Sequence, residues 1–276
     1  MTSDQTTLDY EARAAIAADV RAQLVADLDS GLDTLHTYDS HPSEDLRRDL
    51  LAMTWQLAQE SSDESVRQAL VNYMLYTYLH GTPFLQGQAI KFLQDFRVED
   101  FDERAQRALE RVSLSGQYGN EIIRLIGIAD VRSRTDELKQ IAAANWDSIP
   151  NVNLYASPTW AAALALARFG DSASTDRVIA KVKAEPNLIT RASQLFAELG
   201  YTRQPAAFDA LRAYLTSMER TERIKDNVPG TPEALYAARQ FALHVEGCPV
   251  SGKVEEDDLP AIRSWADNQT SWTIRE

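Results

Sequence analysis

A lone cysteine and a nearby histidine are the residues of this 276-residue chain that could support nucleophilic chemistry. A thiol becomes reactive when a neighbouring base or cation lowers its pKa, and His244 lies one helical turn before Cys248. Cys248 follows the C-terminal end of a predicted helix, however, where the negative end of the helix dipole raises a thiol pKa. The sequence therefore favours a passive thiol and leaves a thiol-dependent site at His244 and Cys248 as an alternative.

A second group of candidate residues surrounds His36 and His41. The carboxylates near them in the sequence are Asp33, Asp39, Glu44 and Asp45. Histidine and carboxylate side chains together can bind zinc, but the spacing here matches no ligand signature. We therefore expect no metal, no cofactor and no catalytic residue. A metal-dependent enzyme or accessory domain at His36 and His41 is kept as an alternative.

The segment 247–254 nearly matches the phosphate-binding P-loop pattern. It has both glycines and Lys253 at the required spacing, but Val254 stands where a serine or threonine hydroxyl must reach Mg²⁺. A predicted helix precedes the segment where the P-loop needs a strand, and the acidic run 255–258 would repel a triphosphate. The segment therefore predicts a connection between helices.

The net charge of the chain limits the classes of partner that we expect. The chain has 28 basic and 41 acidic residues and a net charge of −13. Binding to nucleic acids depends on basic surface, so we expect no nucleic-acid partner and no attraction to anionic membranes. There is no run of about 18 apolar residues, and the polar N-terminus lacks the features of a signal peptide, so we expect a soluble chain without membrane insertion. A cytoplasmic protein and an exported protein whose signal has been removed both fit these features.

The elements that would position these residues are helices. Glycine (11) and proline (10) are too scarce for a β-sandwich or barrel of this length. Each of three apolar segments runs into a glycine, which is the signature of a left-handed helix C-cap. These segments are 160–169, 192–199 and 235–246. Second helical patterns, with apolar residues at i, i+3 and i+4, follow them at 174–182, 205–215 and 258–265.

The same alternation continues toward the N-terminus. It predicts helix pairs at 44–60 with 63–80, 88–96 with 102–109, and 121–130 with 135–141. The segment from about 8 to 29 predicts one long amphipathic helix that caps the array, and 1–7 predicts a flexible N-terminus. Loops are expected at 145–155, 218–232 and 248–257.

Tandem helix pairs of 30 to 47 residues, with alanine-rich first helices and a glycine or aspartate at the turn, resemble HEAT-like repeats. The resemblance implies an all-α fold, an α-solenoid of about six antiparallel helix pairs forming a single domain over 8–272 and clearest over 158–268. Armadillo repeats are an alternative; tetratricopeptide repeats fit less well because their fixed period is not kept. Such solenoids serve as scaffolds, adaptors and accessory domains, so the resemblance implies an architecture and names no activity.

Basic residues recur on the second helix of the predicted pairs, although the chain is acidic. Second helices generally line the concave face of HEAT-like solenoids, so the resemblance implies a basic stripe along a groove that binds an anionic segment of a partner. The residues are Arg67, Arg104, Arg107, Arg111, Lys139, Arg177, Lys181, Arg212 and Arg263, of which all but Arg67 are expected to contact a partner. The alternative is that they pair with acidic residues of neighbouring helices.

Aromatic residues add two candidate contact surfaces. Trp146 and Tyr155 lie in a predicted loop, where we expect them to be exposed and to contact a partner. Tyr73 and Tyr76 share a helix face and form either core or an exposed platform, whereas Tyr78 points elsewhere. The sequence therefore favours a non-enzymatic interaction or scaffold module that binds a protein or peptide. A purely structural module without a specific ligand is a further alternative.

Overall fold

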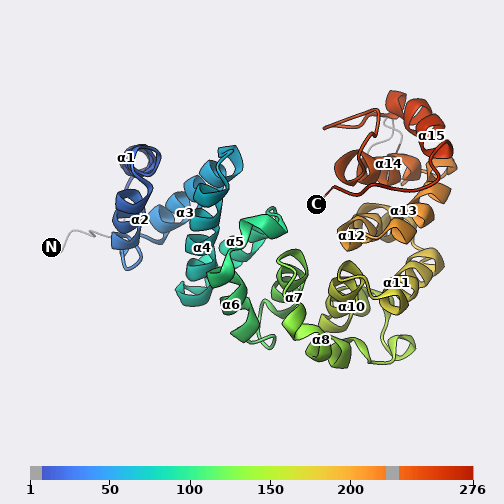
Figure 1. The fold of residues 1–276 in the computed structure, drawn as a ribbon, viewed down its shortest axis with the longest axis horizontal. Coiled ribbons are helices and arrows are strands. Elements are labelled where there is room, and N and C mark those ends of the chain that lie inside the picture. Colours follow the sequence, from blue (N-terminus) through green and yellow to red (C-terminus); the bar gives the residue numbers. More distant parts are fainter. Residues whose placement is uncertain (1–7, 222–229, 276) are drawn as a thin grey trace. The chain divides into compact units, whose positions relative to one another are not determined.

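The computed structural model describes residues 8–221 and 230–275 of the chain (Figure 1). These residues form helices and no β-strand, with two isolated bridges, Arg220 with Pro232 and Val245 with Ile274. The expected all-α class is confirmed. Among the described helices, none combines the length and hydropathy that crossing a bilayer requires. The expected flexible segment 1–7, and part of the expected loop 218–232, lie outside the described residues.

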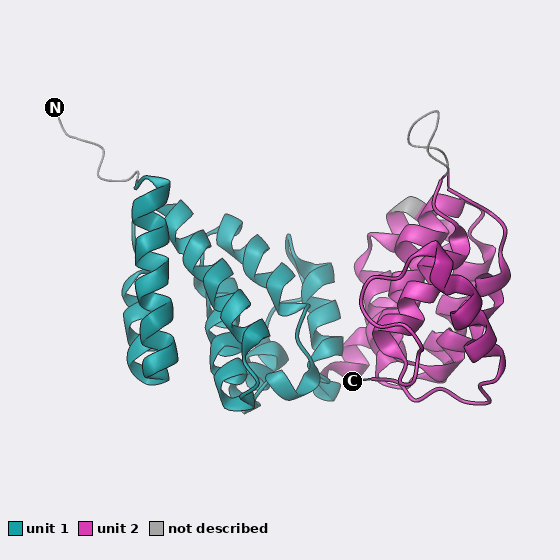
Figure 2. Cartoon of the chain, turned by 90° about the horizontal axis from the view of Figure 1, so that it is seen from above, with its two compact units in different colours: residues 1–133 teal, residues 134–276 magenta. Residues whose placement is uncertain are grey.

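The helices gather into two compact units, unit 1 (1–133) and unit 2 (134–276), which Figure 2 distinguishes by colour. The single continuous solenoid domain over 8–272 stays a prediction. Unit 1 contains α1 (Tyr10–Ala26), α2 (Leu28–Thr37), α3 (Glu44–Glu60), α4 (Glu64–His80), α5 (Pro83–Leu93), α6 (Glu103–Arg111) and α7 (Gly119–Ile128). Unit 2 contains α8 (Thr135–Ala142), α9 (Asn151–Tyr155), α10 (Pro158–Arg168), α11 (Ser172–Ala184), α12 (Phe196–Thr202), α13 (Pro205–Arg212), α14 (Glu233–His244) and α15 (Leu259–Asp267).

In unit 1, helices pack against the next helix but one as well as against their neighbours. α1, α3, α5 and α7 contact one another in that order, and α4 packs against α6. Each of α3 to α6 is preceded by a capping residue. Its side chain accepts a hydrogen bond from a backbone N–H of the first turn. The capping residues are Ser43, Asp63, Thr82 and Asp102. Each such cap stabilises a helix by about 1 kcal/mol, so the capping residues help to set the helix starts.

The prediction of a single long helix from about 8 to 29 is wrong. The chain breaks at Asp27, whose backbone is extended (φ −153°, ψ 106°) and whose side chain accepts a hydrogen bond from Ser30 N to begin α2. The two helices then pack so closely that a Cβ on Gly31 would lie 2.5 Å from Leu24 Cα. The cap at Asp27 and the missing side chain at Gly31 together convert one predicted helix into a helical hairpin.

In unit 2, α8, α10, α12 and α14 contact one another in that order, and α11 packs against α13 (Figure 1). The aromatic core between these helices is formed by fully buried side chains: Trp160, Phe196, Phe208 and Phe241. A π-helix, η4 (Thr190–Leu195), leads into α12, and a 3-10 helix, η5 (Ala213–Thr216), extends α13. The core of unit 2 thus lies between consecutive helices.

One of the three predicted glycine caps has the expected geometry. Gly170 directly follows the end of α10 with a positive φ of 92°. Gly247 also has a positive φ, 72°, but the C-cap of α14, Val245, is extended and lies two residues before it. The cap predicted at Gly200 is wrong, because Gly200 lies inside α12 and Arg203 takes the left-handed conformation at φ 55°. A Cβ on Gly200 would lie 2.4 Å from Gln240 Oε1, so this glycine allows α12 to approach α14.

Candidate functional site

In unit 2, predicted partner-binding arginines instead contact carbonyl groups at the ends of neighbouring helices. Arg177 donates to the carbonyl oxygens of Ala142 (2.9 Å) and Ala144 (2.8 Å), just beyond the last turn of α8. The last carbonyls of a helix lack intrahelical partners and sit at the negative end of its dipole. Arg177 therefore caps α8 from α11.

Arg212 and Arg263 make a reciprocal pair of such contacts. Arg212 of α13 donates to the carbonyl oxygen of Gln269 (3.1 Å), just after α15, and pairs with Asp209. Arg263 of α15 donates to the carbonyl oxygen of Leu215 in η5. The two arginines thus tie the ends of the last helices together.

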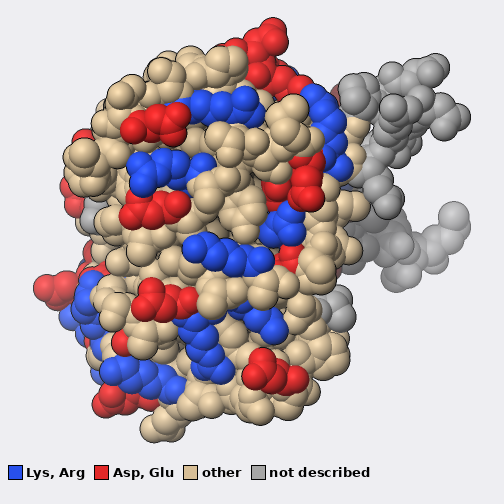
Figure 3. Space-filling view, turned by 90° about the vertical axis from the view of Figure 1, so that its right-hand side faces the viewer, with Lys and Arg blue, Asp and Glu red and all other residues tan. Residues whose placement is uncertain are grey.

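Lys139 and Lys181 lie beside acidic residues in unit 2. Lys139 is exposed, and its charge is among the influences that lower the pKa of Asp171, of which the hydrogen bond from Ser174 is the largest. Burial opposes ionisation of Glu185, but hydrogen bonds, first that from Tyr155, lower its pKa, and the charge of Lys181 adds to them. On the side of unit 2 that carries α11, α13 and α15, basic side chains alternate with acidic ones (Figure 3). Partner binding by these basic residues stays a prediction.

Trp146 and Tyr155 are not exposed, contrary to expectation. Each is only 4% exposed, and their ring centroids lie 5.3 Å and 5.1 Å from that of Trp160. The predicted loop forms a 3-10 helix, η3 (Trp146–Ser148), and α9, which place both aromatic rings against α10. The guanidinium of Arg177 lies 3.8 Å from the centre of the Trp146 ring and covers it. These aromatic residues therefore belong to the core.

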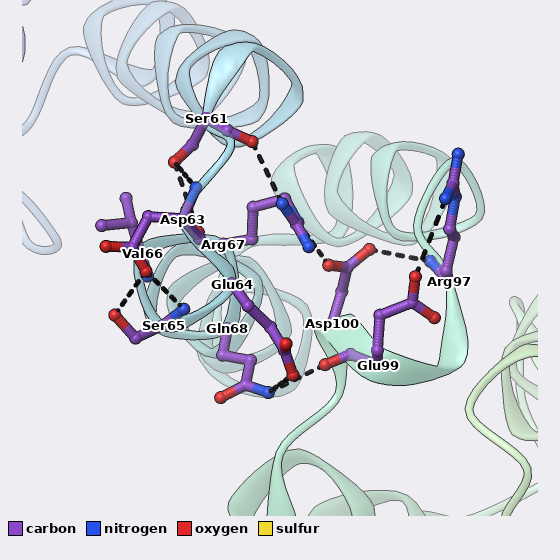
Figure 4. Close-up of polar contacts among 10 residues, drawn as sticks. All are labelled: Ser61, Asp63, Glu64, Ser65, Val66, Arg67, Gln68, Arg97, Glu99 and Asp100. Atoms are coloured by element: carbon purple, nitrogen blue, oxygen red, sulfur yellow. Dashed lines mark hydrogen bonds and ion pairs between the residues drawn. The ribbon is translucent and has the colours of Figure 1, made fainter.

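Unit 1 contains a comparable arginine contact where α3 ends and α4 begins (Figure 4). Arg67 pairs with the buried carboxylate of Asp100 at 2.6 Å and donates to the carbonyl oxygen of Ser61 at 3.1 Å. The other oxygen of Asp100 accepts a hydrogen bond from the backbone N–H of Arg97 (3.0 Å). The Arg67–Asp100 pair lines a hollow of about 300 Å³, together with Asp95, which accepts a hydrogen bond from Trp55.

The three remaining predicted basic residues lie on α6 of unit 1 and are exposed: Arg104, Arg107 and Arg111. Arg107 pairs with Glu103 at 3.0 Å, one turn earlier on the same helix. Arg104 lines a hollow among α2, α4 and α6. All three arginines are therefore accessible to solvent.

A cluster of polar and aromatic side chains joins the end of α2 to α4. His36 Nδ1 lies 2.7 Å from Asp39 Oδ2, and the Tyr73 hydroxyl donates to Asp39 Oδ1 at 3.1 Å. Burial, followed by the charge of Asp39, raises the pKa of Tyr73, so the hydroxyl keeps its proton and acts as a donor. The His36 ring lies 5.1 Å from the rings of both Tyr73 and Tyr76 in edge-to-face geometry. The carboxylate of Asp39 therefore organises this end of α2.

Two hollows flank this cluster and share Tyr73 and Tyr76. We call the first the Arg47 hollow; it has a volume of about 180 Å³. Its lining residues are Tyr38, Asp39, Ser40, Arg47, Leu50, Tyr73, Tyr76, Thr77, His80, Gly81 and Leu85. We call the second the Asn72 groove; it has a volume of about 350 Å³ and lies among α2, α4 and α6. Its lining residues are Asp29, Leu32, His36, Ser65, Gln68, Ala69, Asn72, Tyr73, Tyr76, Asp102 and Arg104.

Arg47 has an incomplete set of partners. Its Nη1 donates to the carbonyl oxygen of Asp39 at 3.2 Å, but its buried Nε has no hydrogen-bond partner among the described residues. Arg47 lies three residues before Leu50 and seven before Thr54, on the buried face of α3. Sequence reasoning did not single it out, although a basic residue at this helical spacing within an apolar stripe was a usable signal.

The Asn72 groove is more polar than the Arg47 hollow. Asn72 Nδ2 donates to Asp102 Oδ2 at 2.8 Å, and Gln68 Nε2 donates to the carbonyl oxygen of Glu99 at 2.8 Å. Burial opposes ionisation of Asp102, but hydrogen bonds from Ala105 N and Asn72 lower its pKa. The groove therefore presents an ionised carboxylate and two ordered amides, with Tyr76, which is 41% exposed, at its edge.

The metal alternative at His36 and His41 lacks a set of ligands within the described residues. No group of three or more histidine, cysteine, aspartate or glutamate side chains in that part of the chain could hold one metal ion. His41 Nδ1 accepts a hydrogen bond from the backbone N–H of Ser43 at 3.1 Å, and His36 contacts Asp39. Both histidines therefore have structural roles at the start of α3 and the end of α2.

The thiol alternative lacks the electrostatics of a nucleophile. Burial raises the pKa of the Cys248 thiol, and burial together with the charges of nearby arginines lowers the pKa of His244 to about 3. The contacts of His244 and Cys248 include no hydrogen bond between the two side chains, whereas His244 Nδ1 contacts Arg203 Nη1. A protonated thiol beside a histidine engaged elsewhere does not form a catalytic pair.

The P-loop-like segment has the structure of a helix connection. Lys253 pairs with Glu255 at 2.6 Å, and Val254 is buried at 1% exposure. A lysine already bound to a carboxylate and a buried last residue do not form a phosphate cradle. The segment connects α14 to the 3-10 helix η6 (Glu256–Asp258), as the sequence indicates.

Comparisons of the chain with known proteins do not extend this description. No protein-family model matches it, and no curated protein and no solved structure does.

Proposed function

We propose that the chain is a non-enzymatic HEAT-like α-solenoid of about six helix pairs that binds a peptide segment of a protein partner. The packing of helices against the next but one, in each unit separately, supports the repeat architecture. The observation that carries the binding proposal is the Asn72 groove. It lies among α2, α4 and α6, with exposed Tyr76 at its edge and Arg104 in its lining.

The chemistry of the groove suits an extended peptide. A peptide presents alternating backbone donors and acceptors, which the amides of Gln68 and Asn72, the hydroxyl of Ser65 and the charged groups of Asp102 and Arg104 can match. All five side chains line the groove. Tyrosine offers a large contact area at a small cost in conformational entropy, which makes Tyr76 the expected anchor of the interface.

A random peptide library displayed on phage tests the proposal, because it requires no known partner. We expect the chain to select peptides, and we expect Tyr76→Ala to weaken their binding at least tenfold, as loss of an aromatic anchor does. Tyr10→Ala is the matched control, since Tyr10 is 74% exposed on α1 and lines neither hollow. Affinities are measured by isothermal titration calorimetry.

Two results would contradict this function. The library could yield no peptide that binds the folded chain, which would favour a purely structural module. Alternatively, Tyr76→Ala and Tyr10→Ala could weaken the selected peptides equally, which would place the binding surface outside the groove. Thermal melting of both variants establishes that they are folded.

A further inference from the structure

We propose that the Arg47 hollow is a subsite for a carboxylate side chain of the bound peptide, with the guanidinium of Arg47 as its ligand. This inference rests on the proposed function, because the peptide in the Asn72 groove supplies the side chain. The two spaces are adjacent, since both are lined by Tyr73 and Tyr76. A residue that passes Tyr76 can therefore enter the Arg47 hollow.

The bonding of Arg47 indicates that a partner is missing. A guanidinium has five N–H donors, and a buried donor without an acceptor is costly. Within the described residues, Arg47 forms no ion pair and its buried Nε has no acceptor. The next residue, Arg48, pairs with Asp45 and with Asp49, both at 2.9 Å. Trp146 Nε1 also lacks an acceptor, but of these two residues only Arg47 lines the Arg47 hollow, so a ligand there can meet its guanidinium.

The size of the Arg47 hollow selects a single side chain. Its volume of about 180 Å³ is below the range of about 300–1,000 Å³ that is usual for small-molecule sites. It is close to the roughly 150 Å³ cavity that holds one benzene ring. Leu50, Leu85 and the ring of Tyr38 provide apolar walls for a short methylene stem. A glutamate side chain has such a stem, with a carboxylate at its end.

The charge of the hollow favours an anion. Asp39 is the acidic residue among the lining side chains, and both of its carboxylate oxygens already contact His36 or Tyr73. Tyrosine rings can also surround a cation, but here a cation would meet the unpaired charge of Arg47. A carboxylate pairs with a guanidinium in a planar, two-bond geometry. The positive charge of Arg47 therefore favours a negatively charged ligand.

Nuclear magnetic resonance of the arginine Nε–H groups tests the subsite directly in the wild-type chain. We expect sodium butyrate, a carboxylate on a short stem, to shift the Arg47 Nε–H resonance saturably. Its neutral counterpart butanamide should leave that resonance in place. The resonance is assigned by its loss in Arg47→Lys. A butyrate titration that does not move it would overturn the carboxylate subsite without any variant having to fold.

Peptide selection gives the second measurement. We expect peptides selected by the wild-type chain to be enriched in glutamate at one position, and glutamate-to-glutamine peptides to bind at least tenfold more weakly. Arg47→Gln should abolish that difference, whereas Arg48→Gln, on the same helix but outside the lining of the hollow, should keep it. Selected peptides with no acidic preference would overturn the subsite and leave the proposed function standing. Butyrate binding without any selected peptide would overturn the peptide function and, with it, this inference.

Discussion

The aromatic side chains of unit 2 are largely shielded from solvent, whereas several of those in unit 1 are exposed. Trp146 and Tyr155 of unit 2 pack on Trp160 and are almost completely buried, although their sequence context suggested a loop. Tyr76 of unit 1 lies within α4, yet it is 41% exposed and lines two hollows. Position in a helix or a loop is therefore a poor guide to which aromatic residue can contact a partner.

Buried charged and polar groups differ in how completely the chain itself supplies their partners. In unit 2, three buried glutamates have internal donors: Glu185 accepts from Tyr155, Glu198 from Trp160, and Glu233 from Arg191 and Ser217. In unit 1, Arg47 reaches the Arg47 hollow with its Nε still unpartnered among the described residues. Groups with complete internal partners stabilise the fold, and groups with incomplete ones are where a ligand contributes most.

Removal of Trp160 should have the largest effect on stability. Trp160→Ala should lower the free energy of unfolding by about 4 kcal/mol, because a fully buried tryptophan is lost and Glu198 loses its indole donor. Tyr76→Ala should lower it by less than about 1 kcal/mol, since the ring is partly exposed. Urea unfolding followed by circular dichroism measures both. Equal losses would show that the two units do not divide their aromatic residues between core and surface.

Acid should destabilise unit 2 through His244. Burial, and then the charges of Arg203, Arg168 and Arg275, lower the pKa of His244 to about 3 in the folded chain. The unfolded chain takes up this proton near its ordinary pKa of about 6.5. The stabilisation is therefore complete above about pH 6.5 and is lost as pH falls toward about 3, by at most about 1.4 kcal/mol per pH unit.

His244→Gln should remove this contribution to the pH dependence. Between about pH 6.5 and 5, the wild-type chain should lose up to about 2 kcal/mol more stability than the variant does. Urea unfolding at several pH values measures the difference, with His80→Gln, an exposed residue of unit 1, as the control. Identical slopes for the wild-type chain and His244→Gln would contradict the assignment of a neutral, half-buried histidine to unit 2.

The smallest expected effect is the difference in stability loss between an arginine substitution in unit 2 and one in unit 1. Arg177→Ala should cost about 1 kcal/mol, because the Trp146 ring loses its cover and α8 loses a cap. Arg111→Ala on exposed α6 should change stability by less than about 0.5 kcal/mol. Thermal melting measures both changes, and iodide quenching of tryptophan fluorescence should increase only in Arg177→Ala. No increase in quenching would mean that Arg177 does not protect Trp146.

The helices could be predicted because their signals are local. The apolar spacing of 44–60 and 63–80 corresponds to α3 and α4, and Ser43 and Asp63 cap them within the first turn. Gly170 ends a helix in the left-handed conformation that the pattern indicates. Periodicity and caps act over a few residues, so the identity of those residues is enough to locate most helices and to establish the all-α class.

The candidate site depends on contacts between residues far apart in the chain. The cap that Arg177 forms on Ala142 spans 35 positions, and the hydrogen bond from Tyr73 to Asp39 spans 34. The exposed or buried state of a side chain is set by which helices pack over it, and helical spacing does not contain that information. The amino-acid pattern therefore defined helices and a surplus of acidic charge. The packing of those helices decided that Trp146 is core and that Arg47 faces a hollow.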